Sequence, residues 1–228
     1  MTRNLIALLP IKAHSSRVPG KNFRELRGRP LFRWMLDRLL DLDFVDLVLI
    51  NTDARRELEA AGMPRSSRVE VKPRPAHLLG DDVSMNRIIA DDIDSHGAAH
   101  YLMTHTTNPL VGEATLGAAY SDYLNGLKAG HDSLFSVTRH QTRFYDRNAR
   151  PINHDPGNLI PTQDLEPWFE ENSCYYFFSG NSFATTRARI GSKPVMHETP
   201  PGEDVDIDEW RDWYLAEAIM GMNAGTSP

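Results

Sequence analysis

The feature that most constrains this chain is an apolar run followed directly by a loop rich in cations. Residues 5–9 read LIALL and end at Pro10, and residues 11–22 read IKAHSSRVPGKN. A short apolar run bounded by a turn signal is typical of a buried strand. The loop carries Lys12, Arg17 and Lys21, beside small residues whose backbone N–H groups can approach an anion. The sequence therefore predicts a polyphosphate site at the carboxyl end of the first strand.

This cationic loop (residues 11–22) matches a P-loop only in part. Ser15 stands where the first glycine of a Walker A motif belongs, and Asn22 follows Gly20 and Lys21 where Ser or Thr should bind magnesium. No G-x-G-x-x-G follows the first apolar run, which disfavours a dinucleotide-dependent dehydrogenase. The alternative to a phosphate site is an ordinary surface loop with solvated charges.

Apolar segments with strand-like and helix-like spacing alternate along the rest of the chain. We predict strands at residues 46–52, 69–72, 100–106, 133–138, 175–179 and 194–197, and helices at 30–42, 54–61, 84–96, 114–127, 181–190 and 209–222. Such alternation predicts an α/β fold with a mostly parallel central sheet and helices on both faces, which binds ligands beyond the carboxyl ends of its strands. The length of 228 residues suits one domain, residues 1–228.

The alternation breaks between residues 139 and 170. This segment is rich in proline and shows no clear periodicity. A structureless loop of that length is uncommon in a compact domain. We therefore expect an inserted lobe that covers the site as a lid or meets a partner subunit, and with it a homodimer.

Charge is distributed unevenly along the chain, whose formal net charge is −6. Residues 1–40 hold nine Lys or Arg and two acids, whereas residues 203–217, the acidic segment, hold seven acids and one Arg. The net charge argues against a general nucleic-acid binder, and the two clusters suggest an anionic ligand and a cation site. Two solvated faces are the alternative.

Compartment and membrane association can also be inferred. The one cysteine, Cys174, allows no internal disulfide, which fits a reducing cytoplasm. The apolar run at residues 5–9 is too short for a leader peptide, and no apolar run is long enough to span a membrane. We expect a cytoplasmic protein that binds neither nucleic acid nor membrane.

Two carboxylates in the acidic segment, Asp206 and Asp208, are separated by Ile207. In an extended backbone both carboxylates point to one face, while Ile207 points into the core. Two carboxylates, completed by phosphate oxygens and waters, are a usual arrangement for Mg²⁺. Alternatively, they cap the helix that follows, where acids favour the positive dipole end.

Taken together, these stretches resemble the CMP-sialic acid synthetases, or acylneuraminate cytidylyltransferases, and the related CMP-Kdo synthetases. The resemblance covers most of the chain in the same order: residues 11–22, 48–53, 74–76, 81–84, 105–110, 171–173 and 206–208. It implies a Rossmann variant like that of the nucleotide-diphospho-sugar transferases. It also implies a cytidylyltransferase that joins CTP to a 2-keto-3-deoxy sugar acid of the nonulosonic type, with Mg²⁺ as cofactor, giving a CMP-sugar and pyrophosphate.

The resemblance also implies roles for individual residues. The catalytic group would be Lys12, Arg17, Lys21, Asp206 and Asp208, and the last two would bind the metal. The nucleotide would contact Pro10, Lys12, Ser15, Ser16, Arg17, Lys21, Asn22, Arg74 and Ser84. The sugar acid would contact His105, Asn108 and Asn172.

Three residues depart from the family pattern: Lys12 and Val111 stand where arginine is usual, and His105 stands where glutamine is usual. Lysine offers a point charge in place of a bidentate fork. Two alternatives therefore stay open. One is a nucleotidyltransferase for sugar 1-phosphates, although Val111 supplies no charge for a second phosphate. The other is a non-catalytic nucleotide-binding relative, against which Lys21 and the two aspartates argue.

Overall fold

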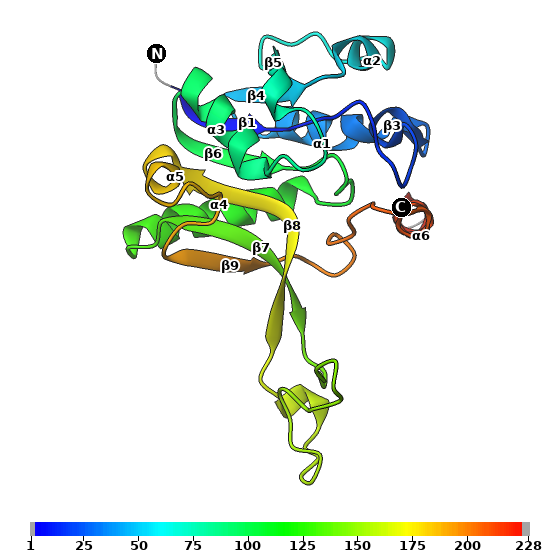
Figure 1. Cartoon of the computed structure of the whole chain (residues 1–228), viewed down its shortest axis with the longest axis vertical. Coiled ribbons are helices and arrows are strands. Elements are labelled where there is room, and N and C mark those ends of the chain that lie inside the picture. Colours follow the sequence, from blue (N-terminus) through cyan, green and yellow to red (C-terminus); the bar gives the residue numbers. More distant parts are fainter. Residues whose placement is uncertain (1–2, 225–228) are drawn as a thin grey trace.

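A seven-stranded sheet forms the centre of the computed structural model, which describes residues 3–224. The strand order is β5-β4-β1-β6-β8-β7-β9 (Figure 1). The strands are β1 (Arg3–Leu8), β4 (Leu47–Thr52), β5 (Val69–Pro73), β6 (Ala98–Thr104), β7 (Ser133–His140), β8 (Trp168–Ser179) and β9 (Pro194–Glu198). The chain moves outward from β1 to β4 and β5 and then crosses to β6 on the other side of β1, so the strand order reverses between β1 and β6.

Most neighbouring strands are parallel, as the sequence predicted. β1 pairs in parallel with β4 and β6, β4 with β5, and β7 with β9. β8 runs antiparallel to both of its neighbours, β6 and β7. The prediction of a short strand at residues 175–179 was wrong in extent, because β8 begins at Trp168 and continues outward beside β7.

Helices cover both faces of the sheet, which confirms the expected α/β layering (Figure 1). Leu5 and Ala7 of β1 point to the face packed by α1 (Leu31–Asp41), α2 (Arg55–Ala60) and α4 (Glu113–Lys128). Ile6 and Leu8 point to the opposite face, packed by α3 (Met85–Ser95) and α5 (Gly180–Thr186). Strict alternation of buried side chains on β1 fixes its register, because a slip of one residue would exchange the two faces.

A small hairpin that the sequence analysis did not predict precedes α1. It joins β2 (Glu25–Leu26) to β3 (Arg29–Pro30). Arg27 and Gly28 form its turn with φ values of 53° and 76°, and positive φ at both central residues suits a two-residue hairpin. Leu26 packs beneath it with Val18, Ile207 and Trp213 of α6 (Trp210–Ala224). Single turns of 3-10 helix lie at Lys21–Phe23, Ala76–Leu78 and Thr162–Asp164.

Residues 139–170 form an arm that projects from the body of the molecule (Figure 1). At its base the ends of β7 and β8 stay paired, from Val137 opposite Glu171 to His140 opposite Trp168. The arm exposes several large apolar side chains: Tyr145, Ile152, Leu159, Ile160, Trp168 and Phe169. Within residues 3–224, no helix is long and apolar enough to cross a membrane.

Two glycines of α4 allow a matched test of how this helix packs on the sheet. A Cβ at Gly126 would lie 2.8 Å from Cγ2 of Val195 on β9, whereas one at Gly117 would meet nothing within 4 Å. Alanine gains helix propensity at both positions, about 1 kcal/mol. We expect Gly117→Ala to raise the free energy of unfolding and Gly126→Ala to lower it by about 1–3 kcal/mol through overpacking. Urea denaturation measures both, and equal changes would contradict this packing.

Candidate functional site

A cavity of about 240 Å³ opens at the carboxyl ends of β1 and β6, beside the point where the strand order reverses. Loops after successive parallel strands meet there, which is where open α/β sheets bind ligands. Its lining residues are Pro10, Lys12, Ser15, Lys21, Asn22, Arg74, Gly80, Asp81, Val83, Met85, Ile88, His105, Thr106 and Thr107. A smaller hollow of about 170 Å³ shares Lys12, Arg74, Gly80 and Asp81 and adds His14 and Asp53.

Seven of the residues assigned to the site from the sequence line this cavity: Pro10, Lys12, Ser15, Lys21, Asn22, Arg74 and His105. Ser16 and Ser84 are exposed and lie outside the lining, although the neighbours of Ser84, Val83 and Met85, belong to it. The apolar part of the wall, formed by Val83, Met85 and Ile88, was not assigned from the sequence. Its only signal was the resemblance at residues 81–84.

Lys21 ties the cationic loop to the acidic segment. Its side chain is nearly buried, and Nζ donates to the carbonyl oxygen of Ile207 at 2.5 Å and to Oδ1 of Asp208 at 3.3 Å. Arg17 approaches the other carboxylate oxygen of Asp208 at 3.1 Å. One carboxylate thus offsets two cations of the loop, so segments almost two hundred residues apart form one charged site.

The Asp206-Ile207-Asp208 stretch buries its middle residue, as its spacing predicted. Ile207 is fully buried, and its N–H donates to the carbonyl oxygen of Thr107 on the cavity wall at 2.8 Å. Burial raises the pKa of Asp206, and a hydrogen bond from Thr107 opposes that shift. Oδ1 of Asp206 is buried without a hydrogen-bond partner in the described structure.

The two aspartates therefore suit a hard cation that also binds ligand oxygens. The unpartnered oxygen of Asp206 offers a coordinating atom whose desolvation is otherwise uncompensated. Within residues 3–224, no three His, Cys, Asp or Glu side chains gather as a complete metal cage. A cation held here would need oxygens from a ligand or from water.

Two side-chain anchors hold the cationic loop against the strand ends. Asn22 donates from Nδ2 to the carbonyl oxygen of Lys12 at 2.8 Å and accepts from Oγ1 of Thr106 at 2.6 Å. The N–H of Ala13 donates to Oδ1 of Asp53 at 2.8 Å, which fixes the loop to the end of β4. Asn22 thus shapes the loop as well as lining the cavity.

Arg74 and Lys12 carry positive charge on the same wall but are held differently. Arg74 donates from Nε to Oδ1 of Asn51 at 2.9 Å, and from Nη2 to the carbonyl oxygens of Asn51 and Ile11. Lys12 pairs with Asp81 at 2.7 Å, with both side chains largely exposed. The hydrogen bond and charge of Lys12 lower the pKa of Asp81. An exposed pair contributes little to stability, so Lys12 is free to contact a ligand instead.

His105 presents a neutral imidazole to the cavity. Desolvation lowers its pKa to about 3, and the charges of Arg189 and Lys21 act in the same direction, against the opposing charge of Asp208. Near neutral pH His105 is therefore a hydrogen-bonding group without charge. In this respect it is like glutamine, which is common at this position in the family that the chain resembles.

Asn108 and Asn172 lie outside the cavity lining. Asn108 is fully buried, with Nδ2 3.5 Å from Sγ of Cys174 and with no partner for Oδ1 in the described structure. Asn172 lies in an irregularity of the β7–β8 pairing and donates to Oγ1 of Thr138 and of Thr199, both at 3.0 Å. Cys174 is buried and burial raises the pKa of its thiol, so Cys174 behaves as a core residue.

A doubly covered α/β sheet with a cationic loop facing paired carboxylates is an arrangement suited to nucleotidyl transfer. The chain belongs to the cytidylyltransferase family, whose model matches residues 6–202.

Individual relatives agree with this assignment. An N-acylneuraminate cytidylyltransferase A from Danio rerio is 27% identical over 224 residues, covering 95% of this chain and 50% of that protein. The chain thus spans about half the length of this relative. A CMP-N,N'-diacetyllegionaminic acid synthase from Legionella pneumophila is 26% identical, with 96% of this chain and 97% of that protein covered. Among solved structures, CMP:2-keto-3-deoxy-manno-octonic acid synthetase complexed with CTP shares the fold, with a TM-score of 0.67, 14% identity and coverage of 96% and 99%.

Proposed function

We propose that this protein transfers the CMP group of CTP to a 2-keto-3-deoxy sugar acid of the nonulosonic type. The observation that carries the proposal is the cavity itself. Lys12 and Lys21 of the cationic loop share it with Arg74 and His105, while Lys21 also contacts Asp208, one of the paired carboxylates. The family, and relatives named for sialic and legionaminic acid substrates, support the same substrate class.

In this proposal the cationic loop binds the triphosphate and Arg74 borders the base. The anomeric hydroxyl of the sugar acid attacks the α-phosphorus in line and loses its proton to solvent, the α–β phosphoanhydride bond breaks, and pyrophosphate leaves without a covalent enzyme intermediate. Lys12, Arg17 and Lys21 stabilise the charge on the phosphoryl oxygens and the departing pyrophosphate. His105 faces the sugar acid as a neutral hydrogen-bonding partner.

Asp206 and Asp208 would hold Mg²⁺ beside the phosphates. The unpartnered, buried Oδ1 of Asp206 supports this assignment, as does the hard-oxygen chemistry of both side chains. When bound, Mg²⁺ would neutralise phosphate charge. Asp208 also contacts Arg17 and Lys21 and so helps to orient these two cations.

The direct test is pyrophosphate release from CTP with Mg²⁺ and a panel of nonulosonic acids and Kdo. We expect turnover with at least one sugar acid, and a preference for CTP over UTP because a mismatched base would leave buried polar groups unpaired. Turnover only with added sugar 1-phosphates would favour the other enzyme class. No release with any acceptor would favour a non-catalytic nucleotide-binding protein.

A matched pair of substitutions in the acidic segment tests the metal assignment. Asp206→Asn is nearly isosteric but removes a ligand charge, and we expect it to lower kcat/KM roughly a hundredfold. Asp204→Asn is the control, since Asp204 accepts from Thr138 at 2.9 Å and serves the fold. The measurement is turnover against Mg²⁺ concentration. Unchanged Mg²⁺ dependence in Asp206→Asn would remove Asp206 from the metal site.

We also propose that the arm (residues 139–170) contacts a second copy of the chain. The support is its projection from the body (Figure 1) and its exposed apolar side chains, among them Leu159 at 67% and Trp168 at 42% exposed. Large apolar side chains gathered on a projecting segment are typical of interfaces. Light scattering should give the mass of a dimer, and a smaller mass for the double variant Leu159→Asp/Trp168→Asp. A monomer mass for the unaltered chain would contradict this proposal.

A further inference from the structure

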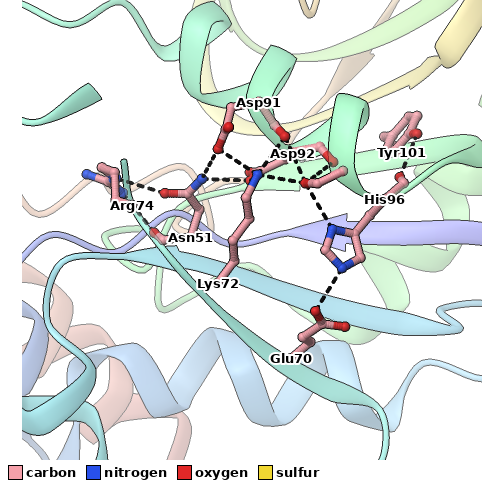
Figure 2. A network of polar contacts seen from close by, with 9 residues as sticks. Asn51, Glu70, Lys72, Arg74, Asp91, Asp92, His96 and Tyr101 are labelled. Atoms are coloured by element: carbon pink, nitrogen blue, oxygen red, sulfur yellow. Dashed lines mark hydrogen bonds and ion pairs between the residues drawn. The ribbon is translucent and has the colours of Figure 1, made fainter. Parts of the chain in front are cut away.

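We propose that Asn51 is a positioning residue that holds the guanidinium of Arg74 at the nucleotide cavity and thereby sets the affinity for CTP. Asn51 lies at the carboxyl end of β4, outside the cavity lining, within a polar network between β4, β5 and α3 (Figure 2). This inference rests on the proposed function, because the ligand it concerns is the CTP of that reaction.

The side-chain amide of Asn51 is oriented by partners at both ends. Oδ1 accepts from Nε of Arg74 at 2.9 Å, while Nδ2 donates to Oδ1 of Asp92 at 2.7 Å and to Oδ2 of Asp91 at 3.2 Å (Figure 2). Rotating the amide by half a turn would place its oxygen against two carboxylates and its NH₂ against a cation. Because Asn51 is fully buried, water cannot compensate for that loss. The amide therefore has one acceptable orientation.

This orientation leaves one end of the Arg74 guanidinium for a ligand. Nε contacts Asn51, and Nη2 donates to the carbonyl oxygens of Asn51 at 2.8 Å and of Ile11 at 3.2 Å. Nη1 has no hydrogen-bond partner among residues 3–224, and Arg74 lines the cavity. A planar guanidinium fixed along one edge presents its remaining N–H groups in a set direction. Carbonyl or hydroxyl oxygens of a pyrimidine nucleotide are suitable acceptors.

The carboxylates behind Asn51 are themselves held by Lys72 of β5. Its Nζ approaches Oδ2 of Asp91 at 2.6 Å and Oδ1 of Asp92 at 3.3 Å, and donates to Oγ of Ser95 at 2.7 Å. Burial raises the pKa of Asp92 to about 6, against the hydrogen bonds from Asn51 and Lys72. When both carboxylates are ionised, their charge balances that of Lys72 and Arg74. A buried network of this kind rigidifies its members when every group is satisfied.

A double-mutant cycle on direct CTP binding tests the inference. Calorimetric titration of the full chain with CTP and Mg²⁺ would compare Asn51→Ala, Arg74→Ala and the double variant. We expect Asn51→Ala to weaken CTP binding about tenfold or more, as for the loss of a hydrogen bond to a charged group. In the Arg74→Ala background the same substitution should have no further effect, because Asn51 acts through Arg74.

The control is Glu70→Gln, at the far end of the same network. Within the part of the chain that the structure describes, the Glu70 side chain joins the network through His96 alone, at 2.8 Å, and it has no contact with Arg74 (Figure 2). CTP affinity should stay within about twofold of the unaltered chain. Thermal unfolding confirms that each variant is folded. Should Asn51→Ala not fold, Asn51→Ser enters the same cycle, since its hydroxyl can still donate to a carboxylate but is too short to reach Nε as well.

The outcomes separate this inference from the proposed function. Unchanged CTP binding in Asn51→Ala, or an equal loss in both Arg74 backgrounds, would overturn the positioning role while leaving the proposed function standing. An equal loss would mean that Asn51 supports the fold independently of Arg74. Absence of CTP binding by the unaltered chain would overturn both. If Asn51→Ala weakens CTP binding only when Arg74 is present, the positioning role of Asn51 is established.

Discussion

The architecture of the site depends on one buried interaction, between the Lys21 ammonium and the backbone at Ile207. An ammonium taken out of water loses several kcal/mol of hydration unless acceptors replace the water. The carbonyl oxygen of Ile207 and the carboxylate of Asp208 are those acceptors, and Ile207 is itself locked into an apolar cluster with Val18 of the cationic loop. Polar and apolar contacts thus join the same two segments. Neither the loop nor the acidic segment can move without exposing a charge or an apolar side chain.

The cations around the cavity differ in how firmly the protein holds them, and we expect firmly and loosely held cations to act differently on a ligand. Lys21 and Arg74 are fixed by backbone carbonyls, which a ligand does not displace. Among residues 3–224, the ammonium of Lys12 has one partner, the exposed carboxylate of Asp81, whose attraction is weakened by water. In the reaction proposed above, a site that binds a charged substrate and releases a charged product benefits from both kinds. Fixed charges define the position of the ligand, and a loosely paired one can follow charge as it moves.

Much of the fold was predictable from the sequence, because buried strands and amphipathic helices have different periods. The position of the cationic loop was predictable for the same reason, since Lys12 and Lys21 follow an apolar strand. The antiparallel direction of β8 was not, because its outer third, from Trp168 to Glu171, is exposed and carries no period of burial. The role of Asn51 could not be predicted either, but for a different reason. A polar residue at the end of an apolar strand gives no sign of its partners, and Asp92 lies on a helix forty residues away.

The departures from the family pattern concern different parts of the site. Val111 is fully buried among core residues on the face of the sheet that α1 and α4 cover. A charged side chain at this position would therefore be cut off from water. His105, whose pKa is lowered to about 3, adds no charge to the cavity wall near neutral pH. The positive charge that lines the cavity therefore comes from Lys12, Lys21 and Arg74, which belong to the cationic loop and to the segment after β5. Under the proposed function, selection among sugar acids at His105 would depend on hydrogen-bond geometry, which rejects a mismatched partner more strongly than an apolar wall does.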